Sequence, residues 1–111
     1  MTIACENLGD ILVAAPQGQL NSVNSAEAET ELVAHVSAGV RKLALDFSKL
    51  DYISSAGLRV VLVLAKRLKQ ADGSLVIFGM QPHVREVFDI SGFLAILNVV
   101  ETREQAQGQL A

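Results

Sequence analysis

The sequence has no tryptophan, a single cysteine and only two prolines among its 111 residues. One cysteine excludes an internal disulfide and suits a reducing compartment. Aromatic residues make up 5% of the chain and apolar residues 50%, so the core must consist mainly of Val, Leu, Ile and Ala. The length predicts a single domain over residues 1–111.

Basic charge and long apolar segments are also scarce. The net charge is -3, which argues against direct nucleic-acid binding because that binding depends on clustered Lys and Arg. No segment offers the roughly 18 uncharged apolar residues that a membrane span needs. The opening "MTIACENLGD" lacks the basic start and apolar run of a secretion signal. We therefore expect a cytoplasmic protein that does not insert into a membrane.

Common enzyme motifs are absent as well. The sequence contains no G-x-S-x-G elbow, no GxGxxG or Walker loop, and no His/Cys cluster for a metal. The two histidines, His35 and His83, stand in no motif, and Cys5 is interpreted as an inert side chain. We expect a protein that is not an enzyme and that needs neither a cofactor nor a metal.

Strands and helices alternate along the chain. Five strands are expected, at residues 2–5, 11–16, 42–47, 74–79 and 95–100. Four helices are expected, at about residues 24–39, 57–70 and 82–91 and from 102 onward. Capping boxes are expected at Asn24 with Glu27 and at Thr102 with Gln105, and Gly39 is expected to end the first helix. An opening hairpin followed by strand–helix alternation predicts an α/β fold with a largely parallel sheet.

One segment concentrates the polar side chains of interest: "LDFSKLDYISSAGLRVVL", residues 45–62. A strand ends in Asp46, and a loop then leads to Ser54, Ser55 and the small residue Gly57 at the start of a helix. Open α/β sheets place functional groups at this edge. A serine here can cap the helix, and a helix N-terminus also tolerates an added phosphate. Both hypotheses stay open on spacing alone.

The helix that follows is unusually apolar, with no polar residue from position 60 to 65. A stripe containing Leu58, Leu62 and Ala65 is enough to face the core. The residues left over are Val60, Val63 and Leu64. They are either buried as well or form a surface that a partner covers.

At these residues the chain resembles the anti-sigma-factor antagonists, bacterial members of the STAS domain family. The resemblance extends over "GQLNSVNSAE" (residues 18–27), over "GSLVIFGMQPHVREVFDISGF" (residues 73–93) and into the final strand and helix. It implies a STAS-like α/β fold, with a four- to five-stranded mixed sheet, an opening hairpin and about four helices packed mainly on one side.

The resemblance also implies partner switching. The unphosphorylated protein would bind an anti-sigma factor that is also a GHKL-type serine kinase, and the sigma factor would be released. Phosphorylation by that kinase would inactivate the protein, and a PP2C-type phosphatase would restore it. ATP would be the kinase's substrate and would not bind to this chain.

The family's phosphoacceptor corresponds to Ser55, with Ser54 as the rival because it stands where many relatives have Asp. Asn21 replaces an Asp that the family often has after its second strand, which removes a charge there. Asp46 has two open interpretations, a hydrogen bond that holds its turn or a direct partner contact. The expected docking residues are Asn21, Asp46, Ser48, Ser54, Ser55, Ala56, Gly57, Leu58 and Val60.

Two other functions remain as alternatives. Small STAS domains also serve as non-catalytic subunits of membrane lipid-transport complexes, in which the serine would be only a cap. An enzyme with Ser55 as nucleophile would need a base within reach, and the sequence suggests none.

Overall fold

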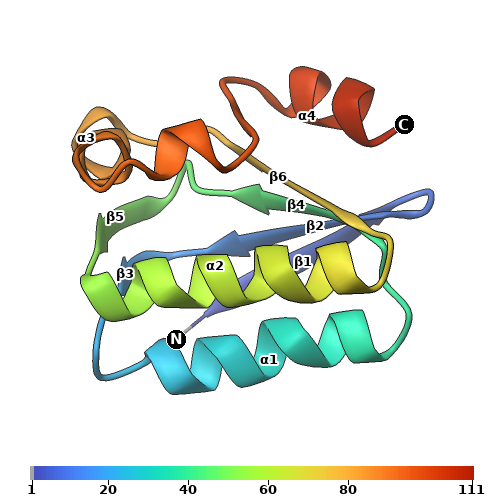
Figure 1. Cartoon of the computed structure of the whole chain (residues 1–111), viewed down its shortest axis with the longest axis horizontal. Coiled ribbons are helices and arrows are strands. Elements are labelled where there is room, and N and C mark those ends of the chain that lie inside the picture. The colour runs from blue at the N-terminus through green and yellow to red at the C-terminus, as the bar shows by residue number, and fades with distance from the viewer. Residues whose placement is uncertain (1) are drawn as a thin grey trace.

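The structure is a computed structural model that describes residues 2–111. A five-stranded sheet and a separate two-stranded sheet form its scaffold (Figure 1). The strands are β1 (Ile3–Leu8), β2 (Ile11–Pro16), β3 (Gly18–Leu20), β4 (Lys42–Asp46), β5 (Leu50–Ile53), β6 (Ser74–Phe78) and β7 (Val99–Val100). The helices are α1 (Ser25–Ser37), α2 (Ser55–Gln70), α3 (Pro82–Ile90) and α4 (Arg103–Leu110), with a short 3-10 turn at Phe93–Ala95.

The larger sheet has the order β1-β2-β4-β6-β7. β1 and β2 form the expected antiparallel hairpin, and β2, β4, β6 and β7 run parallel. Beside the hairpin turn, Asp10 pairs with Lys42 at 3.0 Å, and the hydrogen bond from Lys42 lowers the pKa of the Asp10 carboxyl. The predicted mixed α/β sheet with an opening hairpin is confirmed.

Both faces of this sheet are covered. Leu12 and Ala14 of β2 belong to the core that contains the buried residues of α1 and α2, whereas Ile11 and Val13 pack with Ala106 of α4. Figure 1 shows α1 and α2 together on one side and α4 on the other. Coverage on two faces explains why the inner strands β2, β4 and β6 contain apolar runs without alternation. None of the helices in the described chain has the length and apolar character to span a bilayer.

The two-stranded sheet was not predicted from the sequence. β3 and β5 have three and four residues, too few for a recognisable hydrophobic period, and they pair in parallel with Leu20 opposite Ile53. α3 packs against β5. Parallel strands end at the same edge, so the segments after β3 and after β5 lie next to each other.

The last predicted strand is much shorter than expected. Residues 95–100 were predicted to be extended, but only Val99–Val100 pair with β6, and Phe93–Ala95 form a 3-10 turn. The Phe93 ring contacts Phe88 of α3 with ring centroids 6.4 Å apart, and the N–H of Leu97 donates to the Phe93 carbonyl at 3.0 Å. Packing of Phe93 therefore favours a turn over an extended chain.

The helix caps follow the sequence in part. The capping box of Thr102 with Gln105 is confirmed, and Gly39 follows α1 with a φ of 113°. The box at Asn24 is wrong, because its side chain makes no cap hydrogen bond with α1. Asn24 Oδ1 instead accepts from the N–H of Asn21 at 2.9 Å, and its amide donates to the Gln19 carbonyl. Asn24 therefore closes the turn before the helix.

Candidate functional site

The carboxyl ends of β3 and β5 bring the serine pair next to Asn21. The N–H of Ser54 donates to the Leu20 carbonyl at 2.9 Å, which continues the pairing of the two strands by one residue. Asn21 follows β3 directly, and Ser54 follows β5. The segments that follow β3 and β5 are far apart in the sequence, and they thus lie side by side at the start of α2, at one edge of the two-stranded sheet.

The two serines have different environments. Ser54 is half-buried, with extended backbone, and its Oγ accepts from the N–H of Gly57 at 3.3 Å, so Ser54 is the N-cap of α2. Ser55 is the first helical residue and is exposed, and its hydroxyl has no hydrogen-bond partner among residues 2–111. The helix begins two residues earlier than predicted because the cap is Ser54. One serine holds the helix, and the other presents a free hydroxyl.

Replacing Ser54 by alanine should lower the free energy of unfolding by about 1 kcal/mol, the usual cost of losing a serine N-cap. The matched variant Ser55→Ala should change it by no more than about 0.5 kcal/mol, because Ser55 is exposed. Urea unfolding followed by circular dichroism measures both. Equal losses in the two variants would contradict the assignment of the cap.

Gly57 is required by close packing. A Cβ at this position would lie 2.7 Å from Ile53 Cγ1 and 2.8 Å from the Leu20 carbonyl oxygen. Contacts of this length are not tolerated, so only glycine lets α2 approach β3 and β5. Gly57 and Leu58 are buried and support the edge from beneath.

The structure decides between the two alternatives for the leftover apolar residues of α2. Val60 and Leu64 are only 2% and 0% exposed, and Val63 is half-buried. α1 packs along α2, so a second apolar stripe of α2 is buried. Val60, predicted to contact a partner, instead contributes to the core and to the wall of a hollow between the two helices. The alternative of simple burial holds for Val60 and Leu64.

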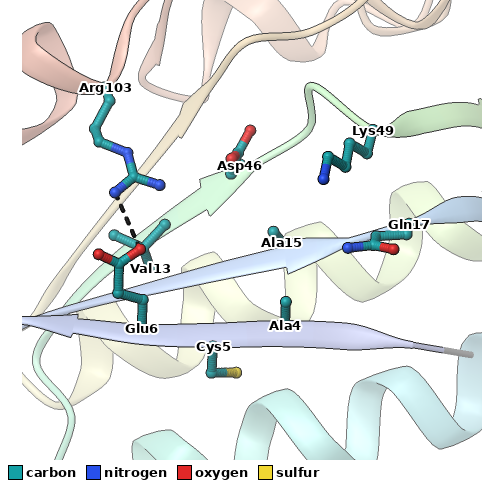
Figure 2. A pocket seen from close by; sticks show the side chains of 9 residues that line it. All are labelled: Ala4, Cys5, Glu6, Val13, Ala15, Gln17, Asp46, Lys49 and Arg103. Carbon is teal, nitrogen blue, oxygen red and sulfur yellow. Dashed lines mark hydrogen bonds and ion pairs between the residues drawn. The ribbon is translucent and has the colours of Figure 1, made fainter.

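Asp46 and Ser48 do not join the serine pair. Asp46 Oδ1 accepts from the N–H of Ser48 at 3.0 Å, which holds the turn after β4. The four residues of β5, a length of about 13 Å, follow this turn before the chain reaches Ser54. Figure 2 shows Asp46 on the α4 side of the sheet, at a hollow of about 260 Å³ into which Lys49 also points. The turn interpretation of Asp46 therefore has a structural basis.

Two exposed apolar residues at the edge were not singled out from the sequence. Val23 is 91% exposed in the turn between β3 and α1, and Tyr52 is 48% exposed on β5. Isolated apolar residues in short polar segments give no periodic signal. Val23 lies two residues after Asn21, and Tyr52 lies on β5 two residues before Ser54.

Asn21 orders the turn that carries Val23. Its Oδ1 accepts from the N–H groups of Val23 at 2.9 Å and Asn24 at 3.3 Å, and its amide donates to Gln19 Oε1 at 3.2 Å. An aspartate would keep the acceptor but lose the donor. The uncharged Asn21 thus holds the turn through both ends of its amide.

Neither histidine is placed to act as a general base for the serines in residues 2–111. In the described residues neither histidine bonds to Ser54 or Ser55: His35 Nε2 lies 3.8 Å from Cys5 Sγ, and His83 Nε2 contacts the Asp51 carbonyl. Burial raises the pKa of the Cys5 thiol, and the Glu31 carboxylate raises it further. No group of three or more His, Cys, Asp or Glu in residues 2–111 could hold a metal ion. The edge can present a hydroxyl to another protein.

Known proteins show the same architecture. The model of the STAS domain family matches residues 2–106. The chain is 51% identical over 106 residues to BtrV of Bordetella bronchiseptica, which is named as an anti-sigma factor antagonist, and the match covers 96% of this chain and 91% of BtrV. A Thermotoga maritima structure described as an anti-sigma factor antagonist has a TM-score of 0.93 at 18% identity and covers 97% of this chain and 93% of its own. Bacillus SpoIIAA in its phosphorylated form has a TM-score of 0.75 at 20% identity, with coverage of 99% and 100%.

Proposed function

The chain belongs to the STAS domain family, and from this premise we propose that it is an anti-sigma factor antagonist that works by partner switching. The unphosphorylated protein binds an anti-sigma factor that is also a GHKL-type serine kinase, and the sigma factor is released. Phosphorylation of Ser55 ends this binding, and a PP2C-type phosphatase reverses the modification. The names of BtrV and of phosphorylated SpoIIAA support this proposal.

One observation carries the choice of residue. The Ser55 hydroxyl at the first residue of α2 is exposed and makes no hydrogen bond within residues 2–111, whereas the Ser54 hydroxyl accepts the N–H of Gly57 as the cap of the same helix. A kinase can reach the first without disturbing the fold. Ser55 needs no base from this chain, because the kinase supplies the catalytic groups and the ATP. The proposal places the protein in the cytoplasm, where ATP is available.

The docking surface is the edge around Ser55. Val23 and Tyr52 supply apolar contacts, and Asn21 keeps the Val23 turn in one conformation. Interfaces commonly gain most of their affinity from a few residues, among which tyrosine is enriched, so Tyr52 is the expected main contact. Ala56 is half-buried beside Ser55, and Gly57 and Leu58 hold α2 in place from below.

Phosphorylation acts on the interface rather than on the fold. A phosphoserine carries about two negative charges, which the N-terminus of a helix tolerates well. α2 therefore remains folded, and the partner meets a bulky anion where it had met a small hydroxyl. The switch requires no rearrangement of this chain.

Phosphorylation by the partner kinase tests the proposal. Intact-mass spectrometry with site mapping should find one phosphoryl group on Ser55, Ser55→Ala should remove it, and Ser54→Ala should retain it. Full phosphorylation of Ser55→Ala would overturn the residue assignment. A chain that never carries phosphate in its native cells and that co-purifies with a membrane ATPase would overturn the switch in favour of a transport subunit.

A further inference from the structure

Arg59 lies one helical turn after Ser55 on α2. Residues four apart on a helix are neighbours on its surface, with Cβ atoms about 5–6 Å apart. Both side chains are exposed, so they share the solvent face of the first turns of α2. An arginine is long enough to place its guanidinium over a group attached to Ser55.

The Arg59 guanidinium is unpaired in the described chain. The ion pairs found in residues 2–111 join Lys42 to Asp10 and Arg103 to Glu6. Arg59 instead borders a hollow of about 180 Å³ between the first turns of α1 and α2. The hollow is lined by Ser25, Ala26, Glu29, Ala56, Arg59 and Val60. Arg59, which has no ion-pair partner in the described residues, thus borders a hollow and lies one helical turn from the proposed phosphoacceptor.

We propose that Arg59 binds the phosphate on Ser55 and so stabilises the phosphorylated state, an inference that rests on Ser55 being the acceptor. A guanidinium presents two parallel N–H donors to phosphate oxygens, which makes arginine well suited to this contact. Glu29 is the acidic residue that lines the same hollow as Arg59, whereas the Asp51 carboxylate on β5 accepts a hydrogen bond from Gln81 Nε2 at 3.1 Å. Neither carboxylate can replace Arg59 as a phosphate ligand.

The contact gives phosphorylation a double effect on the docking surface. Before modification the edge presents a hydroxyl and a free cation that an acidic partner group can contact. After modification it presents an anion, and the cation is occupied by the phosphate. A partner with an acidic group facing Arg59 therefore loses an attraction and gains a repulsion in the same step.

The test uses the full chain with phosphoserine encoded genetically at position 55, so that it does not depend on the kinase. Phosphorus NMR titration measures the second pKa of the phosphate in this protein and in its Arg59→Gln variant. The contact favours the dianion, so Arg59→Gln should raise this pKa by about 0.5 unit, a size typical of an exposed ion pair. Arg59→Lys should give an intermediate value because it keeps the charge but loses the paired donors.

Arg67→Gln is the matched control. It removes the same charge from the same helix at an exposed residue about 12 Å farther along the axis. It should shift the phosphate pKa by less than about 0.1 unit at physiological salt, because the distance exceeds the Debye length. Equal shifts in Arg59→Gln and Arg67→Gln, or no shift in either, would overturn the proposal. The phosphoserine at position 55 is encoded genetically, so this measurement does not depend on which serine the kinase modifies. Site mapping tests the assignment of Ser55 as the kinase's acceptor separately.

Discussion

Ser55→Glu is expected to weaken binding of the proposed partner, an anti-sigma factor kinase, by at least about 100-fold. The substitution buries a carboxylate in an interface that had accepted a hydroxyl, and an unfavourably placed charge there costs several kcal/mol, where about 1.4 kcal/mol is tenfold in affinity. The fold should not change, because a carboxylate in the first turn of a helix is favourable. Isothermal titration calorimetry with the purified kinase measures the dissociation constant, and thermal unfolding checks the fold.

Two matched variants separate the site from general effects of charge. Ser55→Ala should bind the kinase with near-native affinity, because it keeps a small uncharged side chain at the interface. Ser74→Glu adds the same carboxylate at an exposed residue that begins β6, after the far end of the 16-residue helix α2. It should bind normally. Unchanged affinity in Ser55→Glu, or equal losses at both positions, would contradict the placement of the docking surface around Ser55.

Gly57→Ala is expected to lower the free energy of unfolding by about 1–3 kcal/mol, the usual cost of overpacking a well-packed core. The new methyl group would overlap Ile53 Cγ1 and the Leu20 carbonyl oxygen, at 2.7 and 2.8 Å. Relief requires α2 to move away from β3 and β5, which also shifts Ser54 and Ser55. Kinase binding should therefore weaken together with stability.

The sign of this effect is informative, because alanine normally stabilises a helix by up to about 1 kcal/mol relative to glycine. Gly108 of α4 offers the control: a Cβ there meets nothing within 4 Å. Gly108→Ala should stabilise the protein where Gly57→Ala destabilises it, as measured by urea unfolding of both. A stabilised Gly57→Ala variant would show that α2 is not held against the two strands as the structure has it.

The sequence by itself determined the elements that depend on local signals. The sequence predicted the hairpin of β1 and β2, the apolar strands β4 and β6 and the capping box at Thr102 correctly. Together they gave the mixed larger sheet and the order of its strands and helices. The motif around Ser54 and Ser55 also predicted a docking site at the start of α2, where we propose the docking surface lies. Each of these signals lies within a few neighbouring residues, so it can be recognised from the sequence without knowledge of tertiary contacts.

Only the tertiary structure decided how the site is built. The pairing of β3 with β5 brings Asn21 beside Ser54. Burial against α1 places Val60 in the core. Strand β5 lies between Asp46 and the serines and separates them. The structure also assigns the cap to Ser54 and leaves the Ser55 hydroxyl free. Each of these outcomes depends on contacts between segments distant in the chain. Such contacts are set by packing, which hydrophobic periodicity and capping signals do not encode.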